Sequence, residues 1–359
     1  MANKLFFIHG SYYKKNFGDY LLLKRLTNEI EPQDVRLPFS SQDVLEEFGG
    51  EVKKLNFRDF RNTKACIFGG GGYLGEPPEG IQRWSVGFLK RHFIPFITCK
   101  FFGIPVYVIG AGFGPISTPW LQPIIRYMLN NAQLVWLRDK ESVEFAEKIA
   151  PNCSIEMVTD LAQDKTFLLD EIASSNVMLP NSKYIGIHVG LVISDDFRLA
   201  TEVVLNRLAK EGYQFVFFSD SPGHNSNLIS GKVEFADFRN EYSHLITDIC
   251  YEQASDVIKV IDNSEGVITG KLHVGIVAST LSKPVLSFPL HHKTIRYYRH
   301  IGREDSCIES SCSLEKAELS IDSFFDVVTS KIKYDLPENI LVKHKKAIDK
   351  VKAISGIIL

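Results

Sequence analysis

The residues best suited to chemistry stand where a buried strand runs directly into a helix, in the segment Gly266-Val-Ile-Thr-Gly270-Lys271-Leu-His273. Backbone N–H groups at a helix start carry partial positive charge, so Lys271 and His273 stand where an anion can be bound. The imidazole of His273 also titrates near neutral pH and can transfer a proton. Gly270, Lys271 and His273 therefore predict an anion site with a general acid/base; a purely structural histidine is the alternative.

Positive charge is concentrated in two windows of a chain whose net charge is only −2. Neither residues 80–138 nor residues 266–303 contain an Asp or Glu. If both windows face one cleft, they focus positive potential on an anionic ligand, which arginine can bind through two parallel hydrogen bonds. Solvated helix faces are the other explanation. The candidate ligand-binding cations are Arg138 in the first window and Lys271, Lys293 and Arg296 in the second.

Two glycine-rich segments follow predicted strands in the first half of the chain. Residues 70–75 match Gly-x-Gly-x-x-Gly, but Glu76-Pro77-Pro78 blocks the helix that a dinucleotide site requires. We therefore expect no nicotinamide or flavin, and instead a backbone that presents N–H groups to a ligand at Gly71 and Gly72, with a tight turn as the alternative. Gly112 lies in the second segment, Gly-Ala-Gly-Phe-Gly-Pro, which lacks the Gly-Lys-Ser/Thr ending of a phosphate loop.

Three further candidates lie at strand exits. Asn16 and Asp19 belong to the segment Asn-Phe-Gly-Asp between the first predicted strand and a helix expected at residues 20–30. Either residue could bind a ligand, or Asn16 could form a turn while Asp19 caps that helix. His188 lies near the end of a strand predicted at residues 184–189, and we expect it to point into the same cleft as His273.

The elements that must position these residues alternate between short apolar runs and amphipathic stretches, as in a parallel sheet wrapped by helices. The predicted fold class is α/β, with two Rossmann-like doubly wound domains facing a cleft. A polar segment at about residues 164–183 is typical of a linker. We predict an N-terminal domain over residues 1–170, a C-terminal domain over 183–335 and a helix over 336–359 that could pack back on the first domain.

Composition excludes several classes of protein. A chain of 359 residues with 45% hydrophobic residues can bury a core, and its near-neutral charge argues against nucleic-acid binding. No window reaches the roughly 18 apolar residues of a membrane span, and the first apolar run is too short for a signal peptide. The six cysteines are scattered without metal-ligand spacing. We expect a soluble cytoplasmic protein with reduced cysteines and no metal; the oligomeric state is not predicted.

In their order along the chain, these motifs resemble the polysaccharide pyruvyl transferase family. The resemblance implies a glycosyltransferase-B-like fold, with the acceptor side in the N-terminal domain and the donor side in the C-terminal domain. The family usually has Arg-Leu-His where this chain has Lys271-Leu-His273, and lysine lacks the planar two-pronged donor. It often has Gly-Gln-Gly where Ala111 stands. The matching segments are Asn16-Phe-Gly-Asp19, Phe68-Gly-Gly-Gly-Gly72, Gly110-Ala-Gly-Phe-Gly-Pro115, Leu137-Arg138-Asp139 with Ser142, and Gly270-Lys-Leu-His273 with Ala278 and Lys283-Pro284.

The family resemblance implies transfer of pyruvate from phosphoenolpyruvate to two hydroxyls of one sugar, forming a cyclic ketal on a capsule or exopolysaccharide or its precursor. It implies no cofactor beyond the donor substrate. His273 would be the general acid/base, and Arg138 and Lys271 would bind the donor phosphate and carboxylate, with Lys293 or Arg296 adding to the pocket.

The acceptor saccharide could be lipid-linked. The mixture of aromatic residues and cations at residues 84–102 is compatible with contact with the inner face of a membrane, although a buried helix with snorkelling lysines more often gives this pattern. Two other functions stay open. One is a sugar-nucleotide-dependent glycosyltransferase, and the other is a catalytically weak glycan-binding protein of the same fold.

Overall fold

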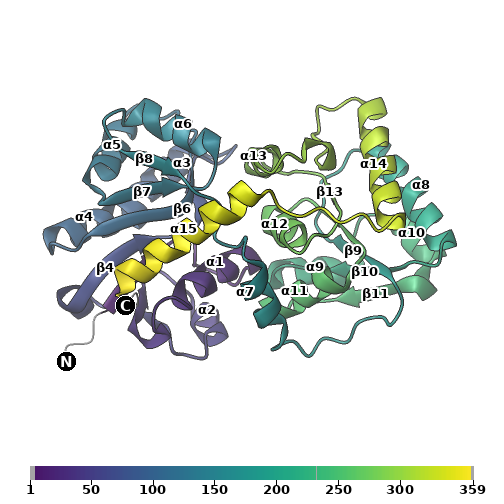
Figure 1. Ribbon diagram of the computed structural model, residues 1–359, viewed down its shortest axis with the longest axis horizontal. Helices are drawn as coiled ribbons and strands as arrows, with labels where there is room; N and C mark the ends of the chain where they lie inside the picture. The colour runs from purple at the N-terminus through teal and green to yellow at the C-terminus, as the bar shows by residue number, and fades with distance from the viewer. Residues whose placement is uncertain (1–4, 232, 357–359) are drawn as a thin grey trace. The chain divides into compact units, whose positions relative to one another are not determined.

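The computed structural model describes residues 5–231 and 233–356, which divide into two compact units (Figure 1). Unit 1 comprises the described residues up to 15, residues 19–161 and the described residues from 339 onward. Unit 2 comprises residues 16–18 and 162–338. The sequence prediction had placed residues up to 170 in the first domain, whereas helix α7 (Lys165–Ile172) belongs to unit 2.

Unit 1 is built on a parallel sheet with strand order β3-β2-β1-β4-β6-β7-β8, and β5 pairs with β6. Every position of β1 is buried, as expected for a central strand covered by helices on both faces. The strand order reverses between β1 and β4, which is where ligands bind in doubly wound sheets. The strands are β1 (Leu5–His9), β2 (Val35–Leu37), β3 (Lys53–Lys54), β4 (Thr63–Phe68), β5 (Gly71–Leu74), β6 (Val106–Phe113), β7 (Leu134–Leu137) and β8 (Ile155–Met157).

The helices of unit 1 cover this sheet, and the C-terminal helix α15 groups with them. Lys64 Nζ donates a hydrogen bond to the carbonyl of Ser355 at 3.0 Å, and His344 Nε2 lies 3.2 Å from the carbonyl oxygen of Leu161. The helices are α1 (Phe17–Thr27), whose first two residues group with unit 2, α2 (Gln42–Glu47), α3 (Ile81–Phe88), a π-helical turn (Leu89–Phe93), α4 (Ile94–Phe101), α5 (Gln122–Asn131), α6 (Lys140–Ile149) and α15 (Glu338–Ser355).

Unit 2 has a second parallel sheet, with strand order β11-β10-β9-β12-β13. Its order reverses between β9 and β12, so the carboxyl ends of these strands mark the expected ligand site. The strands are β9 (Tyr184–His188), β10 (Gln214–Phe218), β11 (Ile246–Ile249), β12 (Gly266–Thr269) and β13 (Val285–Ser287). Besides α7, the helices are α8 (Asp195–Lys210), α9 (Pro222–Ile229), α10 (Ala236–Glu241), α11 (Ala254–Asn263), α12 (Leu272–Thr280), α13 (His292–His300) and α14 (Leu314–Thr329).

Two details differ from the sequence prediction. Helix α1 begins at Phe17, so Asp19 lies in its first turn and does not cap a helix at residues 20–30. Asn16 precedes the helix instead, and its Oδ1 accepts a hydrogen bond from the backbone N–H of Gly18 at 3.1 Å. Strand β6 continues through the second glycine-rich segment to Phe113, where it pairs with β5. Within the described chain, no helix is long and apolar enough to cross a membrane.

Candidate functional site

Three neighbouring strands of unit 2 place charged side chains at one edge of its sheet. Strand β9 ends at His188, Asp220 follows β10 by two residues, and Lys271 follows β12 by two residues. Because β10, β9 and β12 are adjacent and parallel, their carboxyl ends lie side by side. The structure thus brings two residues singled out in the sequence, His188 and Lys271, to opposite sides of one carboxylate.

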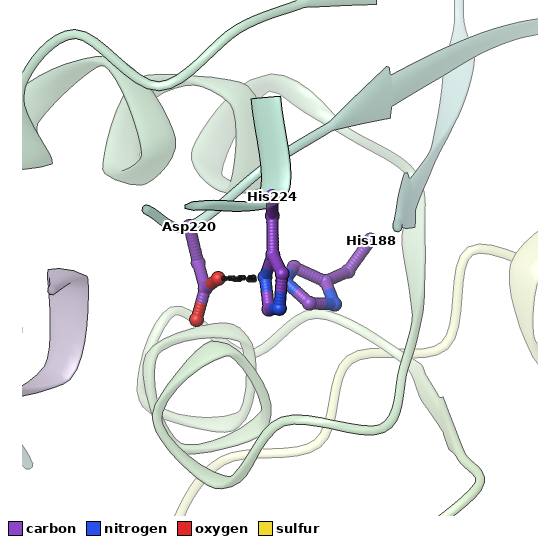
Figure 2. A group of neighbouring side chains, drawn as sticks. All are labelled: His188, Asp220 and His224. Atoms are coloured by element: carbon purple, nitrogen blue, oxygen red, sulfur yellow. Dashed lines mark hydrogen bonds and ion pairs between the residues drawn. The ribbon is translucent and has the colours of Figure 1, made fainter. Parts of the chain in front are cut away.

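Asp220 forms the centre of this group. Its Oδ1 accepts a hydrogen bond from His224 Nδ1 at 2.6 Å and lies 3.3 Å from His188 Nε2 (Figure 2). Lys271 Nζ lies 3.5 Å from Oδ2. Burial alone would raise the pKa of Asp220, but the two histidines and the lysine outweigh it and hold that pKa well below its usual range. Burial lowers the pKa of His188, and the neighbouring Asp220 carboxylate opposes this shift.

The loop that carries Asp220 and His224 is held by a hydrogen-bond network. The backbone N–H of Tyr251 donates to Ser219 Oγ at 2.8 Å and to Asn225 Oδ1 at 2.7 Å, and Asn225 Nδ2 donates to the Tyr251 carbonyl at 3.0 Å. Pro222 opens helix α9, where its fixed φ suits the first turn. These contacts fix the loop so that residues 220 and 224 face each other.

Residues 16–18 belong to unit 2 and lie against this group. The backbone N–H of Phe17 donates to the carbonyl oxygen of Asp220 at 3.0 Å. The ring of His273 lies so close to Gly18 that a Cβ on that glycine would be 2.0 Å from Nδ1. Asn16 shapes this turn through its bond to Gly18, whereas Asp19 groups with unit 1.

The start of α12 combines a lysine, a histidine and the backbone N–H groups of a helix N-terminus. Lys271 is the residue before the helix; its own N–H donates to Thr269 Oγ1 at 3.0 Å, and its side chain is 33% exposed. A Cβ on Gly270 would lie 2.8 Å from the carbonyl oxygen of Phe288, so only glycine fits there. Helix α13 of the same unit carries the other two predicted cations, Lys293 and Arg296, and Arg296 is buried.

Arg138 is buried in unit 1 and paired with carboxylates, with only 6% of its surface exposed. Its Nη1 donates to Asp160 Oδ2 at 3.1 Å, and its Nε lies 3.5 Å from Asp139 Oδ2. A Cβ on Gly112 would lie 2.8 Å from the guanidinium, so this glycine makes room for Arg138. The structure therefore brings Gly112 and Arg138 together in unit 1.

The glycines at 69–72 are explained in part by packing within the chain. A Cβ on Gly69 would lie 2.5 Å from Leu26, and one on Gly70 would lie 2.8 Å from Leu22, because helix α1 packs on this segment. Gly71 has a φ of +112°, which side-chain-bearing residues rarely adopt. Gly72 is exposed on β5, so its backbone faces the surface.

A buried carboxylate joins the two glycine-rich segments. Glu76 Oε2 accepts hydrogen bonds from the backbone N–H and the hydroxyl of Ser117, each at 2.7 Å. Its Oε1 accepts from the backbone N–H and hydroxyl of Thr118 at 3.0 and 2.9 Å. Burial alone would raise the pKa of Glu76, but these four bonds outweigh it and lower that pKa. The segments 69–78 and 110–118 are therefore tied together.

Sequence reasoning missed several polar residues at strand exits. Asp220 and His224 could have been found, because Ser-Asp-Ser-Pro-Gly-His follows the apolar run at residues 214–218. His9 and His92 could not, since they are 83 residues apart and meet only in the fold, with His9 Nε2 2.7 Å from His92 Nδ1. Burial lowers the pKa of both, to about 3 for His92. His92 lies on the π-helical turn, an irregularity frequent at functional sites.

Two α/β units of this kind define a glycosyltransferase-B-like fold, and solved structures of that class align with the whole chain. The UDP-GlcNAc 2-epimerase from Neisseria meningitidis bound to UDP-GlcNAc has a TM-score of 0.60 at 12% identity, covering 99% of this chain and 98% of that chain. The UDP-GlcNAc 2-epimerase from Methanocaldococcus jannaschii has a TM-score of 0.58 at 12% identity, covering 98% and 99%. The S. aureus MnaA–UDP structure also has a TM-score of 0.58, at 10% identity and 99% and 98% coverage. At these identities the likeness establishes the fold alone.

Comparison of the sequence with protein-family models identifies the family. The model of the polysaccharide pyruvyl transferase family matches residues 16–292, and the chain belongs to this family. The matched range includes both the Asn-Phe-Gly turn at its start and the Lys271–His273 segment near its end. No curated protein matches the chain in sequence.

Proposed function

We propose that the protein transfers pyruvate from phosphoenolpyruvate to two hydroxyls of one sugar in a polysaccharide or its precursor, giving a cyclic ketal and inorganic phosphate. The observation that carries this proposal is the presence of both Lys271 and His273 at the start of α12. Both residues lie inside the range that the family model matches. A cation, a helix N-terminus and an imidazole suit a small polyanion that must also exchange protons.

The reaction needs three events at the donor. Carbon C3 of the enol gains a proton, one sugar hydroxyl attacks C2, and the second hydroxyl then displaces phosphate. Two hydroxyl protons are released in total; one equals the proton gained by C3 and the other leaves with phosphate. We assign proton transfer to His273 and binding of the donor anion to Lys271 and the N–H groups of α12. No redox cofactor is needed.

Asp220 and Arg138 support this assignment differently. The carboxylate of Asp220 lies 3.5 Å from Lys271 Nζ and so orients the ammonium group. Arg138 is paired with Asp160 in a buried setting, which fits a positioning role within unit 1 better than direct contact with the donor. Removing one partner of a buried pair typically costs about 3–5 kcal/mol, so Arg138→Ala reports on stability rather than on donor binding.

The test is isothermal titration with phosphoenolpyruvate and, separately, with a panel of nucleoside diphosphates. We expect saturable phosphoenolpyruvate binding that weakens at least tenfold in Lys271→Met and is unchanged in Lys210→Met, a control at an exposed lysine of the same unit. If the protein binds phosphoenolpyruvate, it would then be incubated with the donor and a panel of acceptor sugars, and phosphate release and ketal formation would be measured. Binding of a nucleotide without phosphoenolpyruvate would overturn the proposal in favour of a glycosyltransferase.

We also propose that the acceptor is lipid-linked and that helices α3 and α4 rest on the inner face of an anionic membrane. Val86, Ile94, Ile97 and Phe101 are 53, 52, 37 and 84% exposed. Arg83 and Lys90 are exposed as well, and the six residues recur every three or four positions from α3 through the π-helical turn to α4, so they form an exposed stripe along this segment.

The charge around this stripe indicates what kind of surface it binds. Arg83, Lys90 and Arg91 are exposed, and the chain has no acid between residues 80 and 138 that would repel a negative surface. Exposed apolar residues flanked by cations are the pattern of a helix that lies in the interface of an anionic bilayer. These exposed apolar and basic side chains support the proposed membrane contact, while the opposite face of the helices packs on unit 1.

A further inference from the structure

We propose that His188, Asp220 and His224 form a binding site for a divalent transition-metal ion, with Zn²⁺ as the ion that best suits these ligands. The sequence pointed to no metal, because the three residues are not spaced as a metal motif. In the fold, one ligand atom from each lies within 4.8 Å of the others, and the side chains converge from β9, from the loop after β10 and from α9 (Figure 2).

The imidazole of His188 supplies an independent argument. It is fully buried, and neither of its ring nitrogens has a hydrogen-bond partner among the residues that the structure describes. Its Nε2 lies 3.3 Å from Asp220 Oδ1 without hydrogen-bond geometry. A buried polar group without a partner is costly, so a ring aimed at a carboxylate and a second imidazole calls for a ligand between them.

The distances suit an ion with short bonds to nitrogen and oxygen. Zn²⁺ binds both at about 2.0–2.2 Å, so two ligands of a tetrahedral site are about 3.4 Å apart. The 3.3 Å between His188 and Asp220 already matches this separation. His224 and Asp220 are 2.6 Å apart and must separate by less than 1 Å, as the metal takes the place of the proton they share.

The number of protein ligands favours a metal ion that keeps one coordination position open. Three protein ligands leave one tetrahedral position free, which distinguishes reactive zinc sites from closed structural ones. His224 is 27% exposed and Lys271 is 33% exposed, so solvent reaches this side of the group. With Asp220 negative and Lys271 positive, a bound divalent ion would make the local charge +2 and would attract an anion. Metal binding itself does not depend on which anion that is.

The test uses the full chain, stripped with a chelator and titrated with Zn²⁺ alone and with Co²⁺ alone. We expect one ion per chain, a rise in the thermal unfolding midpoint, and the intense visible absorption of tetrahedral Co²⁺. His224→Gln should weaken the affinity by more than about 100-fold, because loss of an outer-shell partner already costs 10- to 100-fold. His224 is partly exposed on α9, so this variant should fold; Asp220→Asn keeps the side-chain shape and provides a second variant.

The control is His244→Gln, at an exposed histidine of the same unit, which should bind as tightly as the wild type. Absence of a stoichiometric ion, a Co²⁺ spectrum like that of the hydrated ion, or equal binding by His224→Gln and Asp220→Asn would each overturn the inference. Because the readout is metal binding, failure of the proposed pyruvyl transfer would leave it standing, and its own failure would leave phosphoenolpyruvate binding to be judged separately.

Discussion

The ring of His273 lies against the α-carbon of Gly18, so closely that a Cβ on this glycine would be 2.0 Å from Nδ1. The two residues are 255 positions apart in the sequence, yet residues 16–18 group with unit 2. The Asn-Phe-Gly turn therefore serves as a wall for the imidazole that we assign to proton transfer. Only a glycine at position 18 leaves room for the ring of His273. This contact links the first and last motifs of the family match.

Gly18→Ala should displace His273 and lower the rate of phosphate release from phosphoenolpyruvate at least tenfold. Overpacking of this kind typically also costs about 1–3 kcal/mol of stability, so turnover should be compared at a temperature where both proteins are folded. Gly87→Ala is the matched control, since nothing lies within 4 Å of a Cβ there. Turnover by Gly18→Ala equal to that of Gly87→Ala would contradict the assigned contact.

Loss of the Glu76 carboxylate should loosen the second glycine-rich segment. Hydrogen bonds to a charged group are worth about 1.5–3 kcal/mol each, so Glu76→Ala should lower the free energy of unfolding by at least about 2 kcal/mol. Hydrogen exchange should accelerate at the amides of Ser117 and Thr118, which donate to Glu76. Glu79→Ala, at an exposed glutamate nearby, should change neither quantity. Unchanged hydrogen exchange in Glu76→Ala would show that the hydrogen bonds of Glu76 do not hold the second glycine-rich segment in place.

The buried histidine pair predicts a pH dependence of stability. The folded-state pKa of His92 is about 3, against about 6.5 in an unfolded chain, so the unfolded chain binds more protons between these values. The contribution of His92 to the free energy of unfolding is therefore fully present above pH 6.5, and it is lost progressively as the pH falls toward 3. At pH 5 the loss from His92 is on the order of 2 kcal/mol.

Urea unfolding at pH 7.5 and pH 5 measures this loss. His92→Gln should reduce the difference between the two pH values, whereas His244→Gln, at an exposed histidine, should keep the wild-type difference. Equal differences in all three proteins would mean that His92 is not the group responsible.

The exposed stripe on α3 and α4 predicts binding to anionic vesicles. The wild type should float with vesicles containing phosphatidylglycerol but not with pure phosphatidylcholine, and the bound fraction should fall as salt rises. Ile94→Glu combined with Phe101→Glu should reduce flotation several-fold. Ile229→Glu changes a residue of unit 2 that is 79% exposed, and it should have no effect. Wild-type protein that stays in the soluble fraction would remove the membrane proposal.

The sheets were predictable because their strands are buried apolar runs, and β9 (Tyr184–His188) lies where the sequence predicts a strand at residues 184–189. The grouping of His188 with Lys271 was predictable for the same reason, since both lie at the carboxyl ends of parallel strands. Arg138 shows the limit: the sequence suggests a clamp for a phosphate or carboxylate, but it does not reveal that Asp160, 22 positions away, is the carboxylate that Arg138 contacts in the fold. Strand β5 was missed because its pairing with β6 depends on tertiary contact and runs against the low strand propensity of glycine.

The four hydrogen bonds of Glu76 have a consequence for engineering. Residues 69–78 and 110–118 form one structural unit, because a replacement segment without Glu76, or without Ser117 and Thr118, would break these hydrogen bonds and leave buried polar groups unsatisfied. A chimera that exchanges one of these segments should therefore exchange both at once, together with Leu22 and Leu26, against which the first segment packs.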